Sequence, residues 1–265
     1  MKYIITVISL LFASMATAQE LRTLCNEGIK HLRKQQYEEA AACFKKASAK
    51  TTNDNEKVYV HANLAFSYRM YGNLEDALSN YNTALEIEKN ETTLLQQRAE
   101  IYMLLEQTDK ALADYSTVIA YEPHNTGALL YRAYIHTHNG DISNARKDYH
   151  KVMTLEPENE NARLGYAKLY QKEKRYNECL MMLGQLIEEN PHKAEFFIVR
   201  SGVERELGHT ELALMDVEKA INLEPDNANH YILQSILFEE LGKKGAAEKS
   251  RNKAYMLGGV PYTIE

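Results

Sequence analysis

The sequence predicts an all-α fold, a solenoid of repeated helix pairs, and three regularities indicate it. Proline recurs every 34 residues, at Pro123, Pro157, Pro191 and Pro225. A small residue recurs at the same interval, at Ala77, Ala111, Ala145, Cys179, Ala213 and Ala247. Another small residue lies 12 positions before each of these. Periods of 20–50 residues are typical of stacked repeats, in which each unit buries its apolar face against its neighbours.

The same positions predict the elements of one repeat in order. A first helix is followed by a short turn that often holds glycine, as at Gly72, Gly140, Gly208 and Gly242. A second helix follows, and it ends at a polar turn with proline, which lacks the backbone N–H that would continue a helix. Four residues after the second small position the sequence has a large residue, namely Phe44, Tyr81, Tyr115, Tyr149, Leu183 and Val217.

The paired small residues predict where the two helices of a repeat cross. The first members are Gly28, Ala65, Ala99, Ala133, Ala167, Ser201 and Ser235, and Ala40 completes the earliest pair. Small side chains let two helix backbones approach closely, and the large residues then fill the space beside the crossing. We therefore expect both small positions and the large one to be buried in every repeat.

This combination of period, small pair, aromatic residue and proline resembles the tetratricopeptide repeat proteins. The resemblance covers residues 19–265 as seven repeats, near 21–54, 58–91, 92–125, 126–159, 160–193, 194–227 and 228–261. It implies a right-handed superhelical solenoid, with first helices lining a concave groove and second helices on the convex side. The family often has tryptophan in the first helix where this chain has His61 and Arg163, among others.

The first 18 residues have the features of a signal peptide. Lys2 precedes the apolar run YIITVISLLF, and Ala16-Thr17-Ala18 has the small residues that signal peptidase requires. An uncleaved anchor is the alternative, although this run is short for a bilayer of ~30 Å. We expect an exported protein with no membrane span after cleavage, located in the periplasm of a Gram-negative bacterium.

Composition and charge narrow the classes of function. The formal net charge is −6, which argues against general nucleic-acid binding because that depends on neutralising phosphates. Three cysteines are too few for a disulfide-built fold, and a bond between Cys25 and Cys43 is left open. We expect Cys179, at a small-residue position, to be a buried thiol.

No group of residues predicts catalysis or a cofactor. His136 and His138 lie two apart and so point to different faces of a helix, unlike a zinc-binding pair four apart. We expect no metal site, no catalytic residue and no cofactor. The expected function is a non-catalytic scaffold that binds a protein or peptide in the concave groove. A chaperone-like assembly factor is the alternative, and an enzyme with a site in the groove is a distant third.

The resemblance also implies which residues face the groove. The candidates are Ile29, Tyr59, Phe66, Arg69, Gln96, Glu100, Tyr134 and Lys168. For Tyr59, Phe66 and Tyr134, packing between repeats is an equal alternative. The lysine and asparagine with which some relatives hold a partner's C-terminal carboxylate are absent from the corresponding positions, which include Ala62 and Thr93.

Two further expectations concern charge and the C-terminus. Basic residues predominate on the predicted groove of the first five repeats, which predicts a partner with an acidic segment near Arg69 and Lys168. After Gly258-Gly259 we expect the tail to fold back, with Tyr262 and Ile264 covering Leu237 and Phe238. The sequence names neither the partner nor the oligomeric state.

Overall fold

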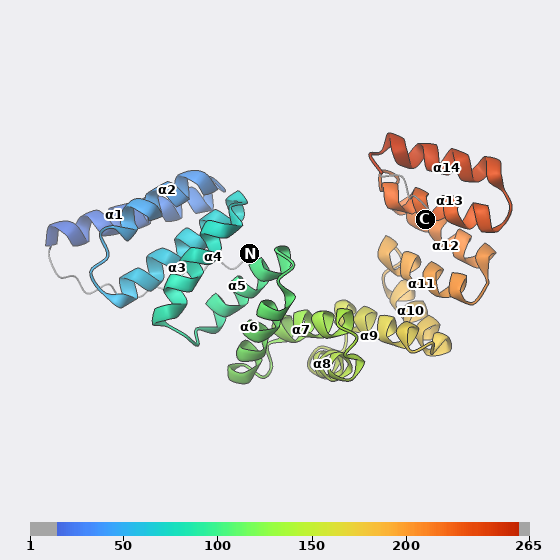
Figure 1. Cartoon of the computed structure of the whole chain (residues 1–265), viewed down its shortest axis with the longest axis horizontal. Coiled ribbons are helices and arrows are strands. Elements are labelled where there is room, and N and C mark those ends of the chain that lie inside the picture. The colour runs from blue at the N-terminus through green and yellow to red at the C-terminus, as the bar shows by residue number, and fades with distance from the viewer. Residues whose placement is uncertain (1–14, 260–265) are drawn as a thin grey trace. The chain divides into compact units, whose positions relative to one another are not determined.

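The structure is a computed structural model that describes residues 15–259, and it confirms the all-α repeat fold (Figure 1). Within this range there are fourteen helices and no strand. Their bounds, taken as successive pairs, are α1 (Met15–Arg33) and α2 (Tyr37–Ser48), α3 (Asp54–Tyr71) and α4 (Leu74–Ile87), α5 (Thr92–Leu104) and α6 (Thr108–Tyr121), α7 (Thr126–His138) and α8 (Ile142–Leu155), α9 (Glu160–Lys172) and α10 (Tyr176–Glu189), α11 (Ala194–Glu206) and α12 (Thr210–Leu223), and α13 (Ala228–Glu240) and α14 (Lys244–Met256).

The small and large positions are buried as expected. Every member of both small series, from Gly28 to Ala247, is buried, and so is the large residue of each of the first six repeats. Gly28 shows why a small residue is needed, because a Cβ added there would lie 2.7 Å from the ring of Phe44. Gly165 is a second such place, where an added Cβ would collide with the ring of Tyr149. Close helix contact in this fold depends on these positions.

The turn inside each repeat contains one residue in the left-handed region. In four repeats it is a glycine, for example Gly72 with φ of 94° and Gly140 with φ of 76°. In the other three it is Gln35, Glu106 or Lys174, each with φ of 58° or 59°. Left-handed backbone costs a non-glycine residue roughly 1–2 kcal/mol. The sequence pattern predicted only the glycine turns.

Asparagine organises the turn between repeats. Asn125 donates a hydrogen bond to Glu122 on the other side of Pro123, and its own side-chain oxygen accepts from the backbone N–H of Ala128. The turn at Asn159 repeats both bonds, and Asn227 also bonds the preceding glutamate but accepts from the N–H of Asn229, two residues on instead of three. Each asparagine therefore caps the next helix, which explains why the Glu-Pro turns of these three repeats end in asparagine.

The chain divides into two compact units, and each is described by itself. Unit 1 ends at Ile135 and unit 2 begins at His136, so that α7 crosses the division. A core of unit 1 joins α1, α2 and α3 around Leu21, Phe44 and Val60. A core of unit 2 joins α9, α10 and α11 around Leu183 and Phe196.

Two predicted segments reach beyond the described residues. Residues 1–14 of the predicted signal lie outside them, and α1 already begins at Met15. Tyr262 and Ile264 also lie outside them, so the predicted fold-back stays a prediction. Gly259 does end α14 by donating its N–H to the Ala254 carbonyl at 2.9 Å. In residues 15–259, no helix has the length and apolar character needed to cross a membrane.

The cysteines are unbonded, whereas the unusual first-helix residues have polar partners. Cys25, Cys43 and Cys179 are free thiols, so the bond left open between the first two is not formed. Burial raises the pKa of the Cys179 thiol to about 11. His61 lies 2.7 Å from the side-chain oxygen of Asn80, and Arg163 donates two hydrogen bonds to Glu189. These polar contacts occupy the place of the family's large apolar residue.

Candidate partner-binding surfaces

The first helices of unit 1 are tied together by an ion pair. Arg69 on α3 lies 2.6 Å from the carboxylate of Glu100 on α5, and both side chains are more than three-quarters buried. Arg69 also donates a hydrogen bond of 2.7 Å to Gln97 on α5. These contacts cross from one repeat to the next. They fix two successive first helices relative to each other on the face where a partner was predicted to bind.

Two buried tyrosine hydroxyls belong to the second helices that follow α3 and α5. Tyr81 on α4 and Tyr115 on α6 are fully buried, and among the described residues theirs are the buried side-chain polar atoms that have no hydrogen-bond partner. Burial raises the pKa of both phenols, and the charges of Arg69 and Glu100 act on both. The ring of Tyr115 stacks on Tyr131 of α7 with centroids 5.2 Å apart. These tyrosines therefore connect the core of unit 1 to its first-helix face.

Three of the predicted groove residues pack against the core. Ile29, Tyr59 and Phe66 are half-buried against the cluster that joins α1, α2 and α3. The alternative of packing between repeats accounts for the contacts of Tyr59 and Phe66. Gln96 is also engaged, since it accepts a hydrogen bond of 3.4 Å from Asn125.

Large apolar side chains remain exposed on the same face. Met70 on α3 and Leu104 on α5 occupy the equivalent position of two successive repeats, and Leu104 is 62% exposed. Tyr134, on the unit 1 part of α7, is 46% exposed, and Tyr131 is similarly exposed one turn earlier. The first-helix face of unit 1 therefore combines a fixed polar centre with exposed apolar and aromatic groups.

The first helices of unit 2 also carry contacts between repeats. Lys168 on α9 lies 3.0 Å from Glu195 on α11, and Gln171 on α9 donates to Glu206 on α11 at 2.7 Å. Arg205 on α11 then pairs with Glu240 on α13 at 2.6 Å. Each contact joins one first helix to the next, as the Arg69–Glu100 pair does in unit 1.

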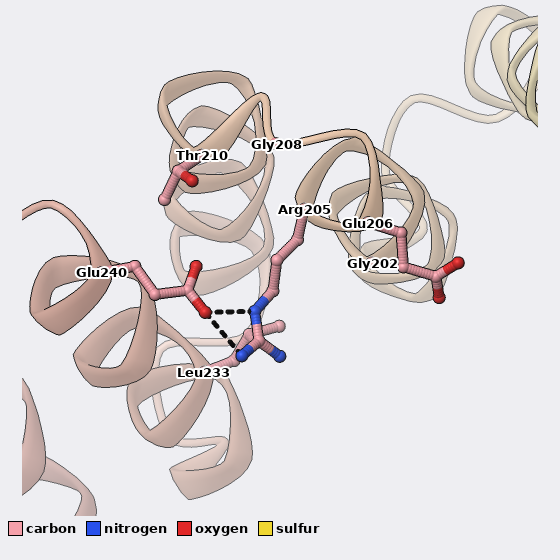
Figure 2. Close-up of a pocket in the computed structure, with 7 residues that line it drawn as sticks. All are labelled: Gly202, Arg205, Glu206, Gly208, Thr210, Leu233 and Glu240. Atoms are coloured by element: carbon pink, nitrogen blue, oxygen red, sulfur yellow. Dashed lines mark hydrogen bonds and ion pairs between the residues drawn. The ribbon is translucent and has the colours of Figure 1, made fainter.

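A cleft of about 610 Å³ lies at the last of these contacts. In Figure 2 the Arg205 side chain reaches from α11 to the Glu240 carboxylate, with Leu233 beside it. Glu206 points away from that pair, and Gly208 and Thr210 form the end where α12 begins. Since the arginine and glutamate neutralise each other, the cleft offers no unpaired basic group.

The eight predicted groove residues are divided between the two units. Seven belong to unit 1, and Lys168 belongs to unit 2. The two cations predicted to attract an acidic segment, Arg69 and Lys168, are each paired with a glutamate of the next repeat. A partner's carboxylate would have to compete with Glu100 or Glu195. The acidic segment of the partner therefore stays a prediction.

Sequence reasoning missed a second ion pair inside the repeats. Arg98 on α5 donates two hydrogen bonds, of 2.8 and 2.7 Å, to Asp114 on α6. Arg200 and Asp216 form the same arrangement in unit 2 at 2.8 and 2.6 Å. In both pairs arginine precedes aspartate by 16 residues, and the two pairs are three periods apart. This recurrence in the sequence could have predicted both ion pairs. Among residues 15–259, no cluster of three metal-ligating side chains occurs.

Comparison with known proteins decides the family. Two family models described as tetratricopeptide repeat match residues 97–152 and 136–199. A solved tetratricopeptide repeat protein from Parabacteroides merdae is 26% identical and superposes with a TM-score of 0.82, over 92% of this chain and 94% of that one. The chain is a tetratricopeptide repeat protein. A third model, described as a domain of unknown function (DUF6340), matches residues 26–118 of this repeat protein.

Other solved repeat proteins share the fold at lower identity. YrrB, described as a repeat protein with an unusual peptide-binding site, is 20% identical with a TM-score of 0.56, over 72% of this chain and 96% of that one. PilW, described as a type IV pilus biogenesis factor, is 17% identical with a TM-score of 0.65, over 75% and 92%. No curated protein matches this tetratricopeptide repeat chain.

Proposed function

We propose that this protein is a non-catalytic scaffold of the bacterial cell envelope that binds a partner peptide or domain on its first-helix face. The observation that carries the proposal is the set of exposed apolar side chains on the first helices of unit 1, Met70, Leu104, Tyr131 and Tyr134. Exposed apolar patches of this kind are typical of protein-binding surfaces. Repeat arrays use such extended faces to bind proteins rather than to catalyse reactions.

The polar side chains on the same helices would orient the bound peptide. Arg69 is held by its bonds to Gln97 and Glu100. These three side chains therefore offer hydrogen-bond donors and acceptors to a peptide backbone in positions that are already fixed before binding. The charges of Arg69 and Glu100 also act on the buried hydroxyls of Tyr81 and Tyr115. An extended peptide with apolar side chains at intervals fits this combination. The similar proteins YrrB and PilW, described as peptide-binding and as a pilus biogenesis factor, support this class of function.

Binding through this face is tested by crosslinking. A photoreactive amino acid placed at Leu104 in the full chain should capture one saturable partner in intact envelopes, identified by mass spectrometry. Tyr134→Ser should weaken capture, because it removes an exposed ring from the face. Tyr121→Ser is the matched control, since Tyr121 is also exposed, at 58%, but lies at the end of the second helix α6. Equal loss in both variants, or no capture, would overturn the proposed face.

The alternative of a chaperone-like assembly factor predicts a different result. A chaperone would crosslink many unfolded envelope proteins at Leu104, and its capture would not saturate with one partner. Denatured model proteins would then compete for the site. The scaffold proposal requires that an excess of such denatured proteins leaves the capture unchanged.

The acidic segment of the partner has its own test. If the partner's carboxylate takes Arg69 from Glu100, then Glu100→Gln should strengthen binding several-fold and Arg69→Gln should weaken it. The gain in Glu100→Gln should shrink as salt is raised, because charge attraction is screened over ~8 Å at physiological ionic strength. Equal effects of both substitutions would show that the pair matters only as a junction between repeats.

Export is tested by the N-terminus of the protein isolated from its host. Cleavage after Ala18 would leave Gln19 first, and the protein should appear in the periplasmic fraction. This cleavage shortens α1 by one turn and keeps Leu21, a buried residue of the first core. Recovery of the uncleaved chain from the cytoplasm would contradict an envelope role.

A further inference from the structure

The second helices of the fifth and sixth repeats expose large apolar residues to solvent. Met181 on α10 and Met215 on α12 occupy equivalent positions, 34 residues apart, and each is 64% exposed. Leu212, one turn before Met215, is also exposed. In the other five repeats this position holds Ala42, Ser79, Ala113, Lys147 and Lys249, which are small or charged. The repeat fold therefore does not need a methionine here.

Gly184 lies one turn after Met181, in the middle of α10. A Cβ added to Gly184 would meet nothing within 4 Å, unlike one added at Gly28 or Gly165. Glycine in a helix interior costs roughly 0.5–1 kcal/mol relative to alanine. The equivalent position in α12 is Glu218, so the fold accepts a long side chain there. Nothing within the described residues uses the space that Gly184 leaves, and glycine is the residue that lets another backbone approach closely.

The border of this surface is acidic. Glu188 on α10 and Glu211 and Glu218 on α12 are exposed, and among the ion pairs and side-chain hydrogen bonds within residues 15–259 none involves their carboxylates. Lys219 is the basic residue among them. The neighbouring second helices differ, since α14 carries Lys244, Lys249 and Lys253. The acidic border of α10 and α12 therefore differs from the basic surface of α14.

We propose that Met181, Gly184, Leu212 and Met215 form a second docking surface, the methionine face, which binds an amphipathic helix with lysine or arginine beside its apolar stripe. Methionine side chains adapt to varied apolar partners. Gly184 admits a helix backbone at close range, and the three glutamates attract its basic flanks. A second copy of this chain is a poorer occupant, because a symmetric contact would bring the glutamates of both copies together.

This surface is independent of the first-helix face. It lies on second helices, so one partner on each face would make the protein an adaptor between two proteins. A partner helix that contacts only the exposed residues of α10 and α12 would bury a small interface area, and small interfaces are typical of transient complexes. We therefore expect micromolar affinity that falls as salt is raised.

The test uses a defined probe and the full chain. The probe is a fluorescent synthetic helix with leucines at i, i+3, i+4 and i+7 and lysines on both flanks, and binding is measured by anisotropy. Gly184→Leu should weaken binding at least tenfold, because its side chain fills the space for the partner's backbone. Met181→Gln with Met215→Gln should do the same. Neither variant should lower the unfolding midpoint, because Met181 and Met215 face solvent and a side chain added at Gly184 meets nothing within 4 Å. Gly184→Leu should raise the midpoint slightly, since it removes a glycine from a helix interior.

Matched controls lie on α14. Gly245→Leu adds the same side chain at another glycine with nothing within 4 Å, and Met256→Gln removes a methionine that is 82% exposed. Neither should change the affinity. Leu104→Gln should not change it either, which separates this surface from the first-helix face.

Three results would overturn the methionine face. The first is equal binding of a peptide with the same composition but scrambled leucines, since charge alone would then suffice. The second is unchanged affinity in Gly184→Leu. The third is a concentration-dependent dimer in light scattering that Gly184→Leu abolishes, because a second copy would then be the occupant.

Discussion

Arg98 and Asp114 join the two helices of one repeat through a pair of parallel hydrogen bonds. The guanidinium also bonds Asn82 on α4 at 2.8 Å, so it links one repeat to the preceding one. Its hydrogen bond to Asp114 raises the pKa of Arg98 further above its usual value. The Asp114 side chain is 9% exposed, so this aspartate depends on the arginine for its hydrogen bonds.

Replacing one member of this pair should therefore be costly. Arg98→Tyr leaves the Asp114 carboxylate without its partner, and we expect a loss of roughly 1–3 kcal/mol in the free energy of unfolding. In repeat five the equivalent residues are Tyr166 and Met182. The double variant Arg98→Tyr with Asp114→Met should recover much of that loss. Urea unfolding measures both, and a double variant as unstable as the sum of its single substitutions would contradict this coupling.

Two glycines inside helices should respond in opposite ways to alanine. Gly165→Ala places a methyl group against the ring of Tyr149, and such overpacking typically costs 1–3 kcal/mol. Gly184→Ala meets nothing and should stabilise the chain by about 0.4–1 kcal/mol. Thermal unfolding distinguishes them. A destabilised Gly184→Ala would mean that α10 is packed differently from the structure described.

The three thiols should differ in reactivity. Burial raises the pKa of Cys25 to about 12 and that of Cys179 to about 11, so both are protonated and inaccessible at neutral pH. Cys43 is half-buried, although burial raises its pKa as well. Iodoacetamide at pH 8 should therefore label Cys43 first, and mass spectrometry should find the other two labelled only in denaturant. Early labelling of Cys179 would show that α10 opens readily.

Acid should weaken two of the turns between repeats. Hydrogen bonds from Thr92 and Asn125 lower the pKa of Glu122, and those from Asn227 and His230 lower the pKa of Glu224. A lowered pKa in the folded state stabilises the protein above the usual value of 4.5, and this stabilisation is lost as the pH falls below it. Glu122→Gln with Glu224→Gln should lose less stability between about pH 5 and pH 3 than the unmodified chain. An equal loss would assign the acid sensitivity to other groups.

The 34-residue period predicted the fold because it records which residues are buried in each repeat. Ala65 and Ala99, for example, are fully buried where the pattern requires small residues. The burial of individual groove residues was not predictable. The position of a residue in the first helix predicts which way its side chain points, but it does not predict how closely the neighbouring repeat covers that side chain. Phe66 is half-buried for that reason, while Tyr134 stays exposed.

Contacts between repeats were the hardest part of the candidate site to predict. Arg69 and Glu100 are 31 residues apart, whereas Lys168 and Glu195 are 27 apart and Arg205 and Glu240 are 35 apart. These separations differ because long side chains reach different turns of the next helix. A fixed spacing was therefore not available as a signal. The Arg98–Asp114 and Arg200–Asp216 pairs, by contrast, have one spacing and could have been found.

The residues that have left-handed backbone in the turn inside each repeat indicate how the array evolved. Gln35, Glu106 and Lys174 hold this conformation in the first, third and fifth repeats, whereas glycines hold it in the others. From Gly72 to Gly140 to Gly208 the interval is 68 residues, and Glu106 and Lys174 are separated by the same 68. From the second to the sixth repeat a period of two repeats is thus superimposed on the period of one, and Gly242 in the seventh repeat departs from it. This is the pattern expected of an array that lengthened by duplicating pairs of repeats, so that the heritable unit was two repeats.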